Sequence, residues 1–305
     1  MPAIRTDDLT KRFGDGVVAV EDLNLVVEEG EVFGYLGPNG AGKSTTINVL
    51  LDYLRPTEGT ATVLGHDAQD ETQAIHRRIG ILPEGFDLYD RLTGRKHVEF
   101  AVDSKGTNDD PAEILERVGL SPEAADRKAG GYSTGMAQRL ALGMALVGDP
   151  DLLILDEPSS GLDPNGARQM RELVREEASR GTTVFFSSHI LGQVEAVCDR
   201  VGIMNDGRLV AEDTIEGLRE SVGTSSTLEL TVDRMPDEFG LDDLPGVTEA
   251  TVDGNVLRVA VSDPGVKSEV INRVEAQGAT VTDITTRQAS LEDLFAAYTA
   301  EEVTA

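Results

Sequence analysis

The sequence predicts an α/β layer fold followed by a small α+β domain, and three observations carry this prediction. Short apolar runs alternate with helical patterns through the first 220 or so residues, as in α/β proteins. Three of the runs are dense in apolar residues, which is typical of strands covered on both faces. The composition then changes at Ser221–Ser226, which has the character of a linker. We therefore expect one domain over residues 1–220 and another over residues 221–305.

Each strand of the first domain follows from its local pattern. The dense apolar runs predict central strands at Val32–Leu36, Leu152–Leu155 and Thr183–Ser187. Strands of an antiparallel flank are expected at Ala3–Leu9, Val17–Val27 and Thr60–Leu64. The turn sequence Asn205-Asp206-Gly207 predicts a hairpin between Val201–Met204 and Arg208–Ala211. Helical patterns from Thr93 to Leu146, broken by glycine and proline, predict a helical subdomain at about residues 86–146.

The second domain has its own order of elements. Strands are expected at Leu228–Val232, Val247–Val252, Val256–Val261 and Thr280–Thr285. Helices are expected at Val266–Gln277, before the stop signal Gly278, and at Leu291–Tyr298. This order predicts an α+β domain of ferredoxin-like style.

Acidic residues dominate the composition. The 305 residues carry a formal net charge of −28, and lysine is scarce. An ordinary acidic protein fits this composition, and so does adaptation to a salty cytoplasm, where a Debye length of about 3 Å in 1 M salt screens self-repulsion. The lysine-poor composition resembles that of proteins from salt-in halophilic microbes. The same charge argues against a nucleic-acid partner, because no basic stripe is present to displace counterions.

The cysteine content and the hydropathy of the sequence indicate the cellular compartment of the chain. Cys198 is the single cysteine, so no disulfide can form within the chain. No apolar run is long enough to cross a membrane, and the first residues lack the pattern of a signal peptide. We expect a cytoplasmic protein.

The segment after the first central strand carries the most specific chemistry. It reads Gly37-Pro38-Asn39-Gly40-Ala41-Gly42-Lys43-Ser44-Thr45, which fits G-x-x-x-x-G-K-[ST]. The glycines allow close backbone approach, so that N–H groups and a helix N-terminus point at one phosphate. Lys43 can reach the β- and γ-phosphate oxygens, and the Ser44 hydroxyl can bind Mg²⁺. A plain glycine-rich turn is the alternative, which the preceding strand and the helical stretch Ser44–Leu51 disfavour.

Two carboxylates follow the second central strand. Asp156 comes directly after Leu152–Leu155, and Glu157 is the next residue. Parallel α/β sheets bind ligands at the carboxyl ends of their strands. Asp156 can hold Mg²⁺ there through water, and Glu157 can act as a general base on the attacking water. An ordinary acidic turn is the alternative, and the phosphate loop upstream weighs against it.

A serine opens the last helix of the helical subdomain. In Tyr132-Ser133-Thr134-Gly135-Met136, Ser133 is a natural N-cap and the Gly135 amide lies in the first helical turn. The hydroxyl, the free amides and the helix N-terminus form a second surface that can face a phosphate. Physical reasoning alone favours a plain cap here.

The order of these motifs resembles the ATP-binding subunits of ATP-binding cassette (ABC) transporters, over about Ile4–Leu218. The family's signature is usually LSGGQ, of which Tyr132–Met136 keeps the serine and the second glycine but not the glutamine. Ser160-Gly161-Leu162-Asp163 is similar to the family's D-loop, His189 to its switch histidine, and Phe13 to the aromatic residue that stacks on adenine. The resemblance implies a P-loop NTPase with a RecA-like core, and ATP and Mg²⁺ as cofactors.

The resemblance also implies an assembly. Two copies stack head to tail, as a homodimer or a heterodimer, with each ATP between one P-loop and the twin's Ser133/Gly135 surface. Glu157 activates water, His189 stabilises the transferring phosphate, and closure and reopening drive a separate membrane permease on the inner face of the cell membrane. The ending Ser290–Phe295 resembles the C-terminal extension of the drug- and lipid-exporter branch, which indicates export.

One residue departs from the family pattern. The family's Q-loop glutamine is replaced by Glu84, within Pro83-Glu84-Gly85. An ionised Glu84 can accept a hydrogen bond from water or bind Mg²⁺, but it cannot donate as an amide does. Either it is a solvated loop acid, or it senses the γ-phosphate and Mg²⁺ and relays their presence to the permease. The remaining histidines are interpreted as surface residues: His66, His76 and His97.

Two other classes of function remain open. Soluble ABC-type ATPases of translation or DNA maintenance tend to carry two cassettes or a long coiled-coil insertion, whereas this chain has one cassette and no sustained heptads. A nucleotide-binding sensor needs no general base, so the presence of Asp156, Glu157 and His189 weighs against that function.

Overall fold

A computed structural model describes residues 1–14, 16–221, 226–235, 239–241, 244–261, 264–287 and 295. The chain forms two compact units, Met1–Glu212 and Asp213–Ala305, and each is described by itself. Most of the predicted linker Ser221–Ser226 and, apart from Phe295, the predicted helix Leu291–Tyr298 lie outside the described residues. The predicted domain boundary at about residue 220 stays a proposal drawn from composition.

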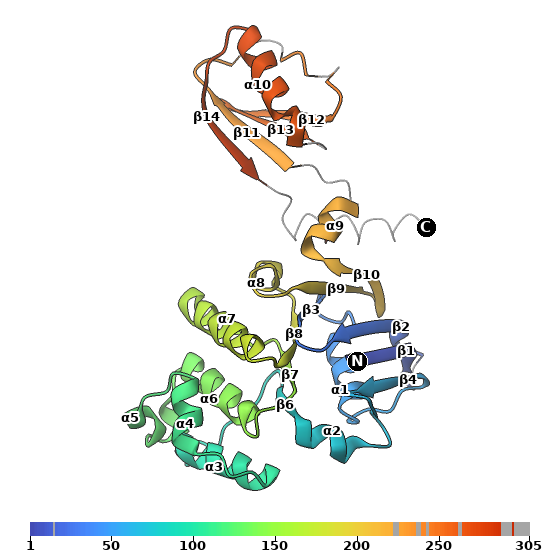
Figure 1. The fold of residues 1–305 in the computed structure, drawn as a ribbon, viewed down its shortest axis with the longest axis vertical. Helices are drawn as coiled ribbons and strands as arrows, with labels where there is room; N and C mark the ends of the chain where they lie inside the picture. Colours follow the sequence, from blue (N-terminus) through green and yellow to red (C-terminus); the bar gives the residue numbers. More distant parts are fainter. Residues whose placement is uncertain are drawn as a thin grey trace. The chain divides into compact units, whose positions relative to one another are not determined.

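A six-stranded sheet forms the centre of the first unit (Figure 1). Its strand order is β10-β9-β3-β8-β7-β6, with β3 at Val32–Leu36, β6 at Ile79–Leu82, β7 at Leu152–Asp156, β8 at Thr183–Ser188, β9 at Arg200–Asn205 and β10 at Arg208–Thr214. Strands β3, β7 and β8 are buried along their whole length and pair in parallel, which confirms the predicted central strands. The predicted β9-β10 hairpin is also confirmed, whereas β6 was not predicted, because it is short and contains Gly80.

The predicted antiparallel flank is confirmed as a second sheet with the order β2-β1-β4-β5. Its strands are β1 at Pro2–Arg12, β2 at Val18–Glu28, β4 at Glu58–Val63 and β5 at His66–Asp67. Two helices accompany these sheets, α1 at Lys43–Leu50 and α2 at Thr72–Arg78. The chain therefore reaches α1 directly from β3, as the phosphate-loop motif requires.

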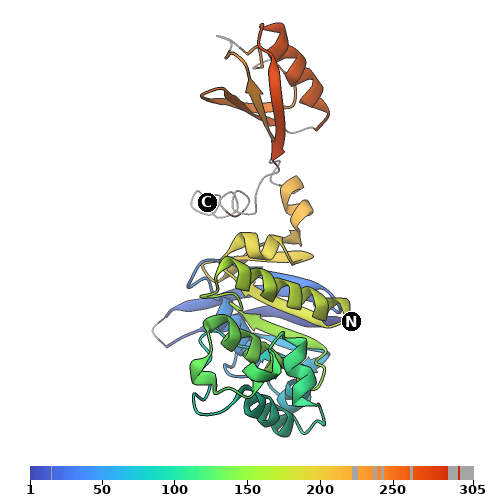
Figure 2. The same ribbon diagram turned by 90° about the vertical axis from the view of Figure 1, so that its left-hand side faces the viewer.

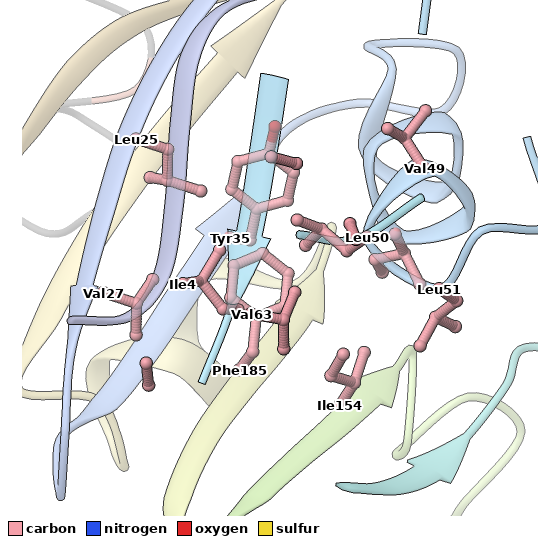
Figure 3. Close-up of a cluster of buried hydrophobic side chains, with 14 of the residues drawn as sticks. Ile4, Leu25, Val27, Tyr35, Val49, Leu50, Leu51, Val63, Ile154 and Phe185 are labelled. Carbon is pink, nitrogen blue, oxygen red and sulfur yellow. The ribbon is translucent and has the colours of Figure 1, made fainter. Parts of the chain in front are cut away.

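The main core lies where the flank, the central sheet and α1 meet (Figure 3). The rings of Tyr35 on β3 and Phe185 on β8 have centroids 5.1 Å apart. Fully buried side chains of β2 and α1 surround them: Leu25, Val27, Val49 and Leu50. Each such side chain stabilises the fold by roughly 1.5–3 kcal/mol. The Tyr35 hydroxyl near the end of β3 also lies 3.1 Å from Oγ1 of Thr46 in α1, so β3 and α1 are held together on either side of the phosphate loop.

The predicted helical subdomain is confirmed (Figure 1, green). It contains α3 at Gly94–Lys105, α4 at Pro111–Arg117, α5 at Pro122–Ala125, the 3₁₀ turn η1 at Ala129–Gly131 and α6 at Thr134–Leu146. The interpretation of His97 as a surface residue is wrong, because His97 is only 2% exposed. It belongs to the buried face of α3, which recurs at helical spacing: Gly94, His97, Val98 and Val102.

Two further helices complete the first unit, α7 at Pro164–Ser179 and α8 at Leu191–Glu195. Within the described ranges, no helix has the length and hydrophobicity that spanning a bilayer requires.

The second unit is a four-stranded antiparallel sheet with one long helix on a face (Figure 2). The strands β11 at Ser226–Val232, β12 at Val247–Asp253, β13 at Val256–Val261 and β14 at Val281–Arg287 are ordered β12-β13-β11-β14. The helices are α9 at Ile215–Ser221, the 3₁₀ turn η2 at Pro264–Val266 and α10 at Lys267–Ala276. Val270 and Val274 of α10 are buried in one cluster with Leu230 and Val259 of the sheet. The predicted α+β character is confirmed.

Candidate nucleotide-binding and active site

The phosphate loop is shaped by two glycines. Gly42 has φ +102°, and a Cβ there would overlap the carbonyl oxygen of Ala19. A Cβ on Gly37 would lie 2.6 Å from the Met204 carbonyl oxygen. Neither position can take a side chain without moving backbone, so both glycines let the loop pack directly against the backbone of β2 and β9. Helix α1 then starts without a side-chain cap, which leaves the N–H groups of its first turn available to an anion.

Lys43 is folded back onto this loop. Its side chain is 6% exposed, and Nζ donates to the carbonyl oxygens of Gly37 at 2.7 Å and Pro38 at 3.3 Å. Nζ also lies 3.8 Å from Oε1 of Glu157. Burial lowers the pKa of Lys43, and the neighbouring carboxylates, Glu157 first, oppose that shift. An ammonium held by carbonyl oxygens can exchange them for phosphate oxygens, which are stronger partners because they are charged.

Asp156 is fixed by the neighbouring strand. It is the last residue of β7 and pairs in register with Ser187 of β8. The buried Ser187 hydroxyl donates to the Asp156 carboxylate and accepts the Glu157 N–H at 3.3 Å. Ser187 is the positioning residue that our sequence analysis missed. The available signal was its place at the end of a central strand, next to the Asp156 strand in the sheet.

Glu157 and His189 form a hydrogen-bonded pair. Oε1 of Glu157 lies 2.8 Å from Nδ1 of His189. A carboxylate can only accept, so Nδ1 carries the proton and donates it to this bond. Glu157 is 6% exposed and has φ +49°, a left-handed conformation that costs a non-glycine residue roughly 1–2 kcal/mol. This conformation is stabilised by its surroundings and places one carboxylate oxygen between Lys43 and His189.

Two pockets meet at the carboxylates. The first has a volume of about 230 Å³ and is lined by Ala19, Pro38, Asn39, Gly40, Gly42, Lys43, Ser44, Thr45, Glu84 and Glu157. The second has a volume of about 360 Å³, and its lining includes Tyr132, Ser133, Thr134, Glu84 and Glu157. Glu84 and Glu157 therefore face both the phosphate loop and the Ser133 region.

Ser133 caps α6 as its sequence indicates. Its hydroxyl accepts the Met136 N–H at 3.3 Å, and Ser133 itself is exposed. Gly135 lies in the first turn of α6, and a Cβ there would meet only Leu162, at 3.8 Å. The Ser133/Gly135 surface is therefore open in a single chain.

The remaining predicted residues lie around the pockets. Within the described parts of the chain, the linings of these two pockets do not include Phe13, Asp156 or His189. Phe13 is 41% exposed, and the Lys11 ammonium lies 5.3 Å from the centre of its ring. Ala41 is buried in the phosphate loop, where its N–H donates to the Pro38 carbonyl oxygen at 3.2 Å.

A divalent cation would have few protein ligands here. The described residues contain no group of three or more acidic, histidine or cysteine side chains arranged to hold a metal. Mg²⁺ bound with a nucleotide keeps several waters and takes one or two protein ligands plus phosphate oxygens. The Ser44 hydroxyl is exposed at the start of α1, and one oxygen of Asp156 is held by Ser187.

Comparisons with protein families assign both units. Residues 20–160 match the family model described as ABC transporter. Residues 214–299 match the model of the C-terminal domain of DrrA1-3-like ATP-binding proteins. The second match agrees with the resemblance seen at the end of the sequence.

Whole-chain relatives carry the same assignment. The chain is 37% identical over 300 residues to the bacitracin transport ATP-binding protein BcrA of Bacillus licheniformis, covering 96% of this chain and 95% of that one. It is 36% identical over 307 residues to the daunorubicin/doxorubicin resistance ATP-binding protein DrrA of Streptomyces peucetius, covering 97% and 92%. Both relatives are named for transport or resistance.

Solved structures agree with this fold. An ATP-binding subunit of an ABC transporter superposes with a TM-score of 0.66 at 30% identity, covering 72% of this chain and 93% of that one. A dimeric ATP-binding cassette in a post-hydrolysis state, with ADP and phosphate bound, gives 0.64 at 27% identity, covering 70% and 98%. The predicted ATPase fold is confirmed. The chain belongs to the ABC transporter family, as an ATP-binding subunit with a DrrA-like C-terminal domain.

Proposed function

We propose that two copies of this chain, or this chain and a related one, bind two ATP molecules between them and drive export through a separate membrane permease. The observation that supports this best is the Glu157 carboxylate, which lies between Lys43 and His189 at the edge of the phosphate loop. Export is supported by relatives such as the fluoroquinolones export ATP-binding protein of Mycobacterium tuberculosis. The subunit then lies in the cytoplasm, on the inner face of the membrane.

In the first half of the site, the phosphate-loop amides and Lys43 hold the triphosphate. Lys43 leaves the carbonyl oxygens of Gly37 and Pro38 and binds the β- and γ-phosphate oxygens. Mg²⁺ would be held by the Ser44 hydroxyl and, through water, by Asp156, with Glu84 close by, and it would neutralise phosphate charge. Phe13 stacks on the adenine.

In the second half of the site, the twin's Ser133 and Gly135 cover the γ-phosphate. Glu157 takes a proton from water, whose oxygen attacks the γ-phosphorus. The bond to the β–γ bridging oxygen breaks, and ADP leaves with that electron pair. His189 donates from Nδ1 to Glu157, and in its imidazolium form it also donates from Nε2–H to the transferring phosphate. Glu84, which faces both pockets, relays the presence of the nucleotide to the permease.

ATP turnover by the purified chain tests the catalytic part of this proposal. Phosphate release in Mg²⁺ is measured for the wild type and for Glu157→Gln, which keeps the side-chain shape but cannot take a proton. Loss of a general base predicts a rate lower by about 10²–10⁴-fold. Equal rates for the two proteins would remove Glu157 from the chemistry.

Membrane fractionation tests the partner. The chain is expressed alone and together with a candidate permease, a multi-span membrane protein of the same organism. We expect the chain in the membrane fraction only when both are expressed, and in the soluble fraction otherwise. The same distribution of the chain with and without the membrane protein would contradict the proposed partnership.

Glu84→Ala tests the proposed relay. In the complex with the permease, this variant should still hydrolyse ATP, but hydrolysis should no longer drive transport.

A further inference from the structure

A buried histidine lies outside the nucleotide site and has both ring nitrogens engaged. Nδ1 of His97 lies 2.8 Å from the carbonyl oxygen of Thr93, and Nε2 accepts the backbone N–H of Tyr89 at 3.0 Å. A carbonyl only accepts and an N–H only donates, so Nδ1 carries the proton and Nε2 does not. The Tyr89 ring stacks on the imidazole with centroids 6.2 Å apart. His97 therefore fixes the backbone of the segment that joins Glu84 to α3.

That segment is hydrogen-bonded to the stretch that leads into the signature. The Ala129 N–H donates to the Leu92 carbonyl at 2.8 Å, and the Gly130 N–H donates to the Asp90 carbonyl at 3.2 Å. A bridge between Thr93 and Lys128 continues the pairing. We call residues 89–94 and 127–130 the paired segments. Ser133 follows the second of them after only two residues.

The paired segments are packed too closely to slide. A Cβ on Gly130 would lie 3.0 Å from the Asp90 Cβ, and a Cβ on Gly94 would overlap the Tyr132 hydroxyl. That hydroxyl donates to the Ala124 carbonyl at 2.6 Å, which holds the residue just before Ser133. A displacement of residues 89–94 must therefore move Ser133 or break these hydrogen bonds.

We propose that His97 is a positioning residue for ATP hydrolysis: by holding Tyr89, it keeps the paired segments joined and sets the place of Ser133 relative to Glu84. The proposal rests on the proposed function, in which Ser133 contacts the twin's triphosphate.

Two substitutions separate the hydrogen bond from the packing. His97→Phe keeps a ring to pack against Tyr89 but has no acceptor, whereas His97→Gln can place an amide oxygen near the position of Nε2. H97F loses the bonds to both Thr93 and Tyr89, and we expect the ATP turnover rate to fall by about tenfold because the Tyr89 N–H is no longer held. The affinity of the separate chain for ATP should stay unchanged, because the phosphate loop is untouched. H97Q should recover most of the rate.

Hydrogen exchange provides a readout that needs no turnover. In H97F, the amides of Tyr89, Ala129 and Gly130 should exchange faster, while those of the phosphate loop stay protected as in the wild type. If the wild type itself did not hydrolyse ATP, the proposed function would fail, and exchange would still decide the role of His97. Gly130→Ala disturbs the same pairing from the other segment, and the same amides of the paired segments should exchange faster. This second variant keeps the pairing testable if the H97F protein does not fold.

Several outcomes would overturn the proposal. Turnover at the wild-type rate in H97F would do so, as would an equal loss of rate in H97F and H97Q. Unchanged exchange at Ala129 and Gly130 in H97F would show that His97 does not hold the paired segments together. If H97F does not fold, unchanged exchange at Ala129 in G130A would show that the two segments are not held by their pairing, which the proposal requires.

Discussion

The two halves of the nucleotide site differ in how complete they are within one chain. On the phosphate-loop side, Lys43 and Glu157 are each 6% exposed, and their partners are already in place. On the signature side, Ser133 is exposed and its hydroxyl only caps its own helix. The phosphate-loop half therefore has its contacts in place within one chain, whereas the signature half leaves its serine open; in the proposed function, this open half acts on a nucleotide held by another chain.

Removing Lys43 should have the largest effect on the site, because Lys43 belongs to the phosphate-loop half, which binds the triphosphate. Lys43→Ala removes the only side-chain cation in the lining of the phosphate-loop pocket, as far as the structure describes that lining. We expect ATP affinity to fall by about 100-fold or more, since a charge-assisted contact in a largely buried site is lost. Titration with a fluorescent ATP analogue measures this. Lys96→Ala is the matched control, because Lys96 is exposed on α3 and pairs with Glu99.

Substituting Glu157 should separate chemistry from assembly. Glu157→Gln is expected to bind ATP with wild-type affinity and to accumulate as an ATP-bound dimer, because closure remains possible and hydrolysis no longer reopens it. Light scattering in ATP and Mg²⁺ measures the mass. A monomer under these conditions would argue against closure around ATP.

Blocking the open half at Ser133 should lower ATP turnover but leave ATP binding by the single chain unchanged. Ser133→Arg places a long side chain on the surface that covers the twin's nucleotide, so we expect turnover to fall by about 100-fold, comparable to loss of a transition-state donor. ATP binding by the single chain should not change. Ser121→Arg is the control, since Ser121 caps α5 in the same subdomain. Equal activity of the two variants would remove Ser133 from the site.

Substituting Ser187 tests whether its hydroxyl holds Asp156 in place in the phosphate-loop half. Ser187→Ala removes the donor to Asp156, whereas the Glu157 N–H keeps the Ser187 carbonyl oxygen, at 3.2 Å, as its acceptor. We expect a loss of about 1–3 kcal/mol in the free energy of unfolding, the usual cost of leaving buried polar groups unsatisfied. Thermal unfolding measures the stability, and phosphate release should show a slower rate with the affinity for ATP kept.

Among these changes, salt should have the smallest effect on formation of the dimer, and there it should act on the open half. Each chain carries a formal net charge of −28, so two chains repel one another. Screening reduces that repulsion, and we expect the E157Q dimer in ATP to tighten as salt rises from 0.05 M to about 1 M. The proposed halophilic origin further predicts loss of structure at low salt. A cooperative melt that does not change between low and molar salt would contradict it.

The two halves also differ in how far the sequence could predict them. The motif Gly37–Thr45 predicted the loop, its strand and its helix, because consecutive residues build the whole feature. The contact between Glu157 and His189 joins residues 32 positions apart and depends on the positions of β7 and β8. The residue types indicated a base and a histidine, but not that they bond directly.

Some residues could not be assigned from local pattern. Ser187 bonds to Asp156 only because the parallel register places them side by side. His97 was taken as polar surface, although its spacing from Gly94, Val98 and Val102 on α3 was an available signal. Phe13 was identified by resemblance, and in the structure it lies exposed with Lys11 over its ring.

Mixing two inactive variants tests the shared site most directly. Lys43→Ala and Ser133→Arg should each be inactive alone, because every site in either dimer lacks one half. A mixed dimer has one site with Lys43 from one chain and Ser133 from the other, and a second site with neither. An equal mixture should therefore recover about a quarter of the wild-type phosphate release, since half of the dimers are mixed and one site in two is intact. No recovery on mixing would contradict a site built from two chains.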